Sequence, residues 1–192
     1  RTQAAVRANL LVVIESLQQA GALVEQRPLH SLQATLQLIQ EQGWLGAAEA
    51  FALHQPLLDS EYAEQLDPRV RRRLESARQM PASQLLRLYQ ARRQLQQQVQ
   101  DELDGAVLIT PTVAHVAPPL APLEQDEELF ARTNLATLRL TMPGSFLDMP
   151  GVALPSGRDA QGLPTGLLLS LPQGHDRQLL DAALALEAAL PR

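Results

Sequence analysis

The sequence predicts an α/β fold, with a helix-rich N-terminal half and a sheet in the C-terminal half. Apolar residues recur at helical spacing near the start, and helix-forming residues dominate up to residue 103. Beyond residue 104, short runs of Val, Leu and Ile are bounded by Pro, Gly or Thr, which is typical of buried strands. The 192 residues suffice for one domain. We expect residues 1–103 to be mainly helical, and residues 104–192 to hold sheet strands and a C-terminal helix.

The first predicted helix ends at Gly21, a residue that commonly terminates helices. The short apolar segment Ala22–Val24 then indicates a strand. The apolar positions of the helix recur every three or four residues, as one face of a helix requires: Ala5, Val6, Leu10, Val13, Ile14 and Leu17.

Two later helices are predicted from their first residues. Asp67 is an N-cap followed by Pro68 at the first helical position, and Pro81 introduces a second helix that runs to about Leu103. Its expected solvent face contains these residues: Arg92, Arg93, Gln96, Gln97 and Gln98. Its expected apolar stripe contains these: Leu85, Leu86, Leu88, Tyr89, Leu95 and Val99.

The C-terminal half contains three apolar runs that we expect to form neighbouring buried strands of a mixed sheet covered by helices. The runs are Val107–Ile109, Val152–Leu154 and Leu167–Leu169. Four prolines after the first run predict an extended loop without regular pairing: Pro111, Pro118, Pro119 and Pro122. A helix is predicted over Glu124–Leu140, and a last helix begins at Asp176. Three acidic residues lie in the first turn of the former helix: Asp126, Glu127 and Glu128. We interpret them as carboxylates that the positive end of the helix dipole stabilises, rather than as an acid-base pair.

Three motifs occur in a fixed order within this C-terminal half. The first has an Asp before an apolar strand that ends in Pro-Thr: Asp104, Val107, Leu108, Ile109, Pro111 and Thr112. The second has Thr-x-Pro followed by an apolar strand closed by Pro-x-Gly: Thr141, Pro143, Pro150, Val152, Leu154, Pro155 and Gly157. The third has Gly-Leu-Pro-x-Gly before an Asp and a Leu pair: Gly162, Leu163, Pro164, Gly166, Asp176, Leu179 and Leu180. Together they resemble the C-terminal third of the amidase-signature family of amide hydrolases.

The resemblance implies the C-terminal part of the amidase-signature fold, from an enzyme that cleaves carbon-nitrogen amide bonds. The family's catalytic triad resembles a Ser activated through a second Ser by a Lys, because a neutral amine in a desolvated pocket accepts the hydroxyl proton. All sixteen basic residues here are Arg, and no Gly- and Ser-rich segment occurs. We therefore expect no catalytic residue in this chain, no activity from it alone, and a catalytic segment upstream.

Five residues are substrate-binding candidates through the resemblance: Arg72, Arg73, Thr141, Ser145 and Asp148. The two arginines lie in a basic stretch from which one Arg reaches a substrate carboxylate in the tRNA amidotransferase branch. The guanidinium suits that role because it binds carboxylates at two points. The simpler interpretation, which we favour, is that the same arginines line a solvated helix face. The family's usual Asn is Ser145 here, and its usual Gly is Asp148, which is closer to the allophanate-hydrolase and broad amidase branches.

Two other functions stay open at the level of sequence. One is a helical interaction module that docks a partner through its Gln-rich helix and hydrolyses nothing. The other is a Ser-His-Asp esterase, although the Gly-x-Ser-x-Gly elbow is absent. Its triad would be drawn from these residues: His115, His175, Ser145, Ser156, Ser170, Asp148 and Asp176. The spacing of the four histidines fits no zinc motif, so we expect no metal and no cofactor.

Composition limits the partners. A net charge of -5 and 3% aromatic residues argue against nucleic-acid binding, and no apolar run is long enough to cross a membrane. The absence of cysteine fits a cytoplasmic protein. The expected partners are the upstream catalytic segment of the same protein and a small-molecule amide in the full-length enzyme. If that segment is missing, we expect exposed apolar surface and self-association.

Overall fold

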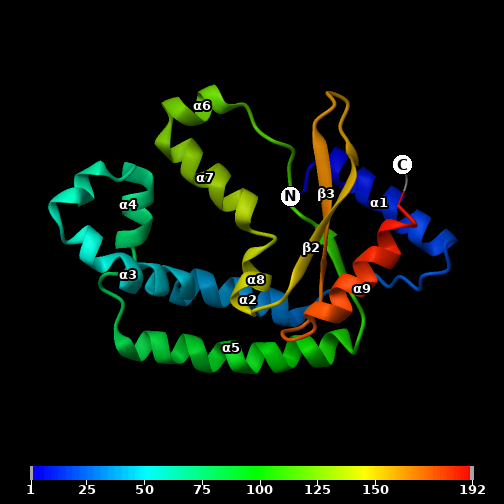
Figure 1. Ribbon diagram of the computed structural model, residues 1–192, viewed down its shortest axis with the longest axis horizontal. Helices are drawn as coiled ribbons and strands as arrows, with labels where there is room; N and C mark the ends of the chain where they lie inside the picture. Colours follow the sequence, from blue (N-terminus) through cyan, green and yellow to red (C-terminus); the bar gives the residue numbers. More distant parts are fainter. Residues whose placement is uncertain (1, 191–192) are drawn as a thin grey trace.

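The computed structural model describes residues 2–190, in which long helices lie beside a small sheet (Figure 1). The N-terminal half is helical, with α1 (Ala4–Gln19), α2 (His30–Gln42), α3 (Leu45–Leu58), the 3-10 helix η1 (Glu61–Gln65), α4 (Pro68–Glu75) and α5 (Ala82–Leu103). The C-terminal half contains β1 (Leu108–Pro111), α6 (Leu120–Gln125), α7 (Glu127–Leu138), α8 (Met142–Phe146), β2 (Gly151–Arg158), β3 (Pro164–Ser170) and α9 (Asp176–Glu187). The predicted α/β class is confirmed.

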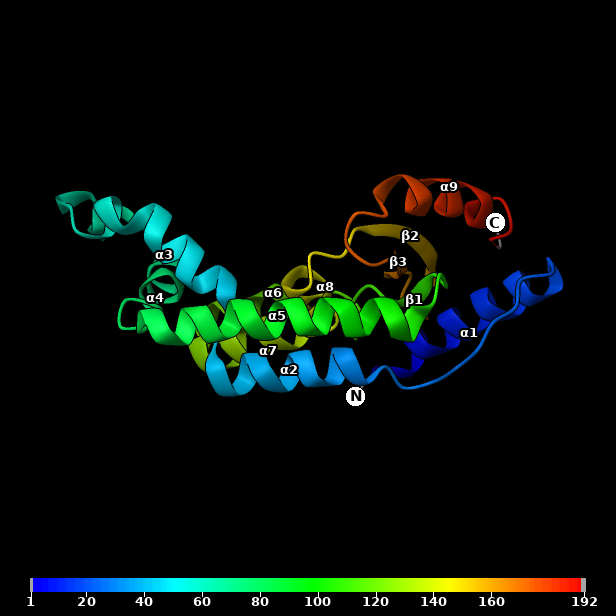
Figure 2. The same cartoon turned by 90° about the horizontal axis from the view of Figure 1, so that it is seen from below.

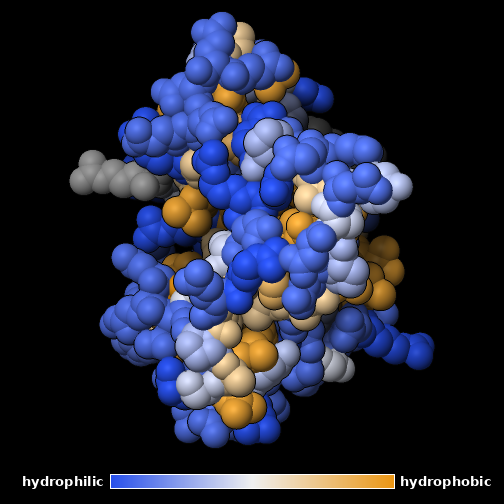
Figure 3. All heavy atoms as spheres, turned by 90° about the vertical axis from the view of Figure 1, so that its left-hand side faces the viewer, coloured by the Kyte–Doolittle hydropathy of each residue, from blue (hydrophilic) through white to orange (hydrophobic). Residues whose placement is uncertain are grey.

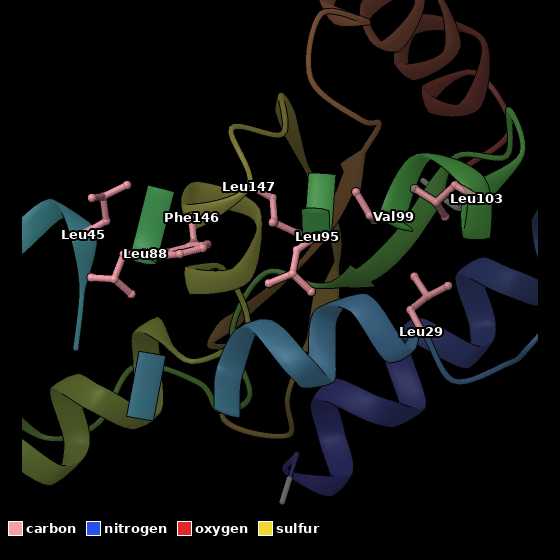
Figure 4. Packing of buried hydrophobic residues seen from close by; sticks show 8 residues of the cluster. All are labelled: Leu29, Leu45, Leu88, Leu95, Val99, Leu103, Phe146 and Leu147. Atoms are coloured by element: carbon pink, nitrogen blue, oxygen red, sulfur yellow. The ribbon is translucent and has the colours of Figure 1, made fainter. Parts of the chain in front are cut away.

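Helices α2 and α5 lie side by side, and α8 packs against both (Figures 1 and 2). Their contact forms the first hydrophobic cluster, to which α5 contributes side chains one or two helical turns apart (Figure 4). The Phe146 ring of α8 lies 6.1 Å from the Trp44 ring. The cluster's buried members are Leu29, Leu45, Leu88, Leu95, Val99, Leu103, Phe146 and Leu147.

The apolar stripe predicted for α5 is confirmed in part. Leu88, Leu95 and Val99 are buried, and the helix ends at Leu103 as expected. Leu86 and Tyr89 instead face solvent. The predicted apolar stripe occupies a wide arc of the α5 surface. The packing of α2 and α8 on one side of α5 buries only part of that arc.

The sheet has the order β1-β3-β2, and both pairs are antiparallel. Ile109 and Val152 lie on either side of Leu169 in the register. The predicted mixed sheet is therefore wrong for the strands described, because the short turn between β2 and β3 can join only antiparallel neighbours. Pro111, predicted to lie in an unpaired loop, instead ends β1 opposite Leu167. An edge strand tolerates this proline because its missing N–H has no ladder partner to lose.

The two faces of the sheet differ in what covers them. Helices α1 and α9 pack on one face and form the second hydrophobic cluster with Leu167 and Leu169, which are 1% and 0% exposed. Leu168 points to the opposite face and is only partly buried, and Ala153 and Pro155 of β2 are exposed. The three predicted strand positions are confirmed. Burial alternates along most of β2 and β3 instead of being continuous, whereas β1 is partly buried throughout.

The helix starts predicted at Asp67-Pro68 and at Pro81 are confirmed, whereas the start predicted at Glu124 is not. The Asp67 carboxylate accepts a hydrogen bond from the N–H of Arg69, and the Asp126 carboxylate accepts one from Leu129. The helix predicted over Glu124–Leu140 is two helices, since Asp126 is extended and begins α7. No strand forms at residues 22–24. The Ala22 N–H donates back to the Leu17 carbonyl of α1, and no neighbouring strand is available to pair with these residues. Among residues 2–190, no helix combines the length and apolar character that a membrane span requires.

Candidate functional site

Three of the five predicted site residues lie on one short segment around α8. Thr141 immediately precedes the helix, Ser145 is exposed on it, and Asp148 is exposed just after it. Pro143 in the first turn favours the helical start. The hydroxyl of Thr141 bonds to the carbonyl of Leu138, so that side chain is already engaged within the chain.

The opposite side of this segment is apolar and anchors it. Phe146 and Leu147 are 1% and 0% exposed, and both belong to the first hydrophobic cluster (Figure 4). Burying these two neighbours directs Ser145 and Asp148 outward. Asp148 has a positive φ of 60°, a conformation that costs non-glycine residues energy but is tolerated best by Asp and Asn. The resemblance has Gly at this position, which agrees with the backbone conformation.

Polar side chains of α5 hold the same segment, a role that the sequence analysis missed. The Arg92 Nε donates to the carbonyl of Phe146 at 2.6 Å, and the Gln96 amide donates to the carbonyl of Leu147 at 3.0 Å. Arg92 also approaches Asp148, with 3.6 Å between the guanidinium and the carboxylate. The prediction that Arg92 and Gln96 face water is therefore wrong: they are partly buried, because the α8 segment folds over that side of α5. Their helical spacing of four residues placed both on one face, but nothing local indicated a partner.

The two arginine candidates lie elsewhere. Arg72 and Arg73 are exposed on α4, which is apart from α8 in both views (Figures 1 and 2). Arg72 pairs with Glu127 of α7 at 3.0 Å, and the Arg69 guanidinium lies 4.6 Å from the centre of the Phe130 ring. This end of the molecule is mostly hydrophilic, with separate hydrophobic spots (Figure 3). A solvated helix face that contacts α7 accounts for these arginines within the chain.

The structure does not assemble a Ser-His-Asp triad. Between residues 2 and 190, no serine hydroxyl is hydrogen bonded to a histidine ring. The His115 ring lies beside the Thr137 hydroxyl and the Val116 carbonyl, and the His175 Nδ1 lies beside the carbonyls of Pro172 and Gln173. Ser156 is buried and bonds to Thr165 at 2.9 Å. The esterase hypothesis therefore lacks its required geometry in this chain.

Neither a metal centre nor a deep pocket marks the site. In the part of the chain that the structure describes, no three His, Cys, Asp or Glu side chains are grouped as metal ligands would be. A cavity of about 220 Å³ lies between the end of α5 and the start of α9. None of the five candidates lines it; its walls include Asp101, Asp104 and His175. The α8 segment is thus an exposed surface rather than an enclosed binding site.

Comparison with known protein families identifies the family of this chain. The family model described as Amidase matches residues 1–180. The chain belongs to the amidase family. A 2-amino-5-chloromuconic acid deaminase of Comamonas testosteroni is 30% identical over 195 residues, covering 96% of this chain and 40% of that enzyme. A 6-aminohexanoate-cyclic-dimer hydrolase of Paenarthrobacter ureafaciens is 31% identical over 93 residues, covering 44% of this chain and 19% of the hydrolase.

Solved structures agree on the fold of this amidase-family chain. The urea amidolyase of Kluyveromyces lactis superimposes with a TM-score of 0.83 at 23% identity, over 99% of this chain and 11% of that one. The allophanate hydrolase of the same yeast gives a TM-score of 0.79 at 23% identity, over 97% of this chain and 30% of that one. The resemblance to amidase-signature enzymes is confirmed. The chain spans less than half of the length of each of these relatives.

Proposed function

We propose that this chain is the C-terminal, non-catalytic portion of an amidase-signature amidohydrolase that cleaves carbon-nitrogen amide bonds in the complete protein. The observation that carries the proposal is the family match together with a composition that contains no Lys. A serine hydroxyl becomes an effective nucleophile only when a nearby base accepts its proton. Without the family's Lys and its Gly- and Ser-rich segment, that activation has to come from residues outside this chain.

The substrate in this proposal is a small-molecule amide, and the chain contributes one border of its site. Ser145 and Asp148 present polar groups on the exposed side of the α8 segment, with Thr141 at its start. In this proposal Arg72 and Arg73 face a substrate carboxylate, and that contact requires the Arg72 pair with Glu127 to open. An exposed ion pair of this kind is weak enough to open, at about 0–1 kcal/mol.

The partner in this proposal is the upstream catalytic segment, and exposed apolar surface supports it. One sheet face leaves Ala153 and Pro155 of β2 uncovered, and β1 and β2 are both edge strands in this sheet. The outward sides of α1 and α9 expose further large apolar side chains: Leu11, Val12, Leu180 and Leu184. Such surface is seldom left open. In isolation the chain would use it to associate with itself. The proposal includes a cytoplasmic location.

The interaction-module hypothesis has no comparable support. Its docking surface was to be the long Gln-rich helix α5. That helix instead buries Leu88, Leu95, Val99 and Leu103 within the chain, against α2 and α8. Its remaining exposed glutamines form an ordinary solvated face.

The test is an amidase assay on the complete protein and on this chain alone. We expect the complete protein to hydrolyse members of a panel of small amides, and the chain alone to give only the background rate. Turnover by the repurified chain that disappears in Ser145→Ala or Ser156→Ala would contradict the proposal and revive a local nucleophile. A complete protein without activity on amides would contradict the assigned reaction.

A further inference from the structure

Four side chains from three distant parts of the chain form a polar ring beside the α8 segment, and the main chain of α5 completes it. Arg92 and Gln96 come from α5, Asp148 follows α8, and Gln173 lies between β3 and α9. The Gln173 amide donates to the Asp148 carboxylate at 2.7 Å, and the Gln96 amide donates to the Gln173 side-chain oxygen at 3.0 Å. Arg92 lies 3.6 Å from the Asp148 carboxylate, and the backbone of α5 joins it to Gln96 one helical turn further on.

Two members of the ring also donate hydrogen bonds to the main chain of the α8 segment. Two successive carbonyls, those of Phe146 and Leu147, accept hydrogen bonds from Arg92 and Gln96. The bond from the guanidinium is charge-assisted, and the Arg92 side chain is only 22% exposed, so water competes with it less than at an open surface. With the side chains of Phe146 and Leu147 buried below, the segment is fixed on both sides.

The ring stabilises the unusual backbone conformation of Asp148. A residue with φ of 60° needs surrounding contacts that over-determine it, and the ring supplies them through Gln173 and Arg92. The conformation of Asp148 sets where the chain goes after α8, and so fixes the outward direction of Ser145 relative to β2. None of the ring glutamines is needed for the hydrophobic core, since the first cluster is made by apolar side chains alone.

We propose that Arg92, Gln96 and Gln173 are positioning residues that hold the Ser145–Asp148 turn in its substrate-binding orientation. The inference rests on the proposed amidase function, because it concerns the border that this turn gives to the amide site. The three side chains act through the turn and do not touch the substrate. Loss of one ring member frees the turn while the buried Phe146 and Leu147 keep α8 in place.

The experiment compares Gln96→Ala with Gln98→Ala in the complete amidase. Gln98 is exposed on the same helix and makes no contact with the ring, so it is a matched control. Hydrogen exchange, followed by mass spectrometry, should become about fivefold faster in peptides covering both 144–149 and 171–175 in Gln96→Ala, which corresponds to one net hydrogen bond. Gln98→Ala should leave both peptides unchanged. Gln173→Ala should reproduce the effect, and combining it with Gln96→Ala should add little.

Kinetics separate positioning from general destabilisation. A loosened binding turn weakens ground-state and transition-state binding together, so Gln96→Ala should raise KM about tenfold and leave kcat within about twofold. Partial unfolding would instead lower the apparent kcat and leave KM unchanged. An unchanged KM despite faster exchange would overturn the positioning role, and unchanged exchange would overturn the ring itself. A third outcome is an unaltered protein that hydrolyses no amide while hydrogen exchange responds to Gln96→Ala as expected. That outcome would contradict both the proposed function and the positioning role, but it would support the hydrogen bonds of the ring.

Discussion

Gly157 shows how a single residue can be required by its neighbours. Its φ is 139°, and a Cβ added there would lie 2.9 Å from the side-chain amide of Asn9. Asn9 cannot easily move away, because its amide donates to the Thr165 hydroxyl at 2.8 Å and to the Arg158 carbonyl at 3.1 Å. This glycine therefore lets α1 approach the bulge in β2, where the register shifts between Pro155 and Gly157.

Replacement of Gly157 should test that approach. We expect Gly157→Ala to destabilise the fold by about 2–3 kcal/mol, through backbone strain and the contact with Asn9. Gly105→Ala is the control, since Gly105 also has positive φ but no atom within 4 Å of the added Cβ. It should cost about 1 kcal/mol. Thermal melts of the two variants give the comparison, and equal losses would mean that Asn9 does not constrain this position.

Glu102 is a second residue whose partners are remote in the chain. Its carboxylate accepts hydrogen bonds from the N–H groups of His30 and Ser31 and from the Ser31 hydroxyl, so it caps α2 from α5. Partial burial acts to raise the pKa of Glu102, but the hydrogen bonds from Ser31 and His30 outweigh it and hold the pKa below its ordinary value. The lowered pKa means that the folded state favours the charged carboxylate.

The lowered pKa of Glu102 predicts a pH-dependent contribution to stability. Its stabilisation is present above the pKa of the unfolded chain, about 4.3, and is lost as the pH falls through the lower pKa of the folded state. Glu102→Gln should therefore cost about 1 kcal/mol at pH 7 and progressively less below about pH 4. Denaturant melts at pH 7 and at about pH 3.5 would measure this. A cost that is the same at both pH values would show that charge plays no part in the cap.

At the scale of elements, the sheet depends on a two-residue period that the sequence does not display. Leu167, Leu168 and Leu169 are identical in type, yet only the first and third face α1 and α9. Side chains alternate between the faces of a strand, so the choice follows from register and from where the helices pack. The pairing of Ile109 and Val152 with Leu169 places this leucine at the centre of the covered face.

Adjacent leucines therefore give a matched pair of variants. Leu169→Asp would bury an unpaired charge and should cost several kcal/mol, enough to unfold a domain of ordinary stability. Leu168→Asp, on the partly exposed face, should cost clearly less in this chain. Gln98→Asp on the solvated side of α5 should stay within about 0.5 kcal/mol. Circular dichroism melts would rank the three, and similar melting of the two leucine variants would contradict the alternation.

For the whole molecule, the two hydrophobic clusters leave an apolar exterior that the chain does not cover. α1 and α9 each bury one side against the sheet and expose leucines on the other, such as Leu11 and Leu184. The open sheet face adds to this surface. A matching partner would bury it, and the upstream segment of our proposal is that partner.

Association of the isolated chain should report on this surface. We expect the chain alone to bind ANS and to self-associate in light scattering as its concentration rises. Coexpression with the upstream segment should suppress both signals. The double variant Leu180→Gln with Leu184→Gln should weaken self-association, because both leucines lie one turn apart on the exposed side of α9. A monomer with low dye binding at all concentrations would contradict the proposed covering.

The sequence by itself determined the features that depend on near neighbours. The helix cap at Asp67 and the three strand positions were predicted correctly, because caps and apolar runs are set by a few adjacent residues. The order of the three C-terminal motifs also indicated the family, which the match over residues 1–180 confirmed. For the candidate site, it brought Thr141, Ser145 and Asp148 to one segment, since they are close in the chain.

Only the tertiary structure decided the features that join distant residues. The antiparallel order β1-β3-β2 and the coil at residues 22–24 depend on which strands are available as partners. The buried side of Leu169 depends on where α1 and α9 pack. Gln96 looks like any glutamine of a solvated helix until α8 and Gln173 are placed beside it. Hydrogen-bond partners and covered faces arise from packing between remote segments, so no local pattern records them.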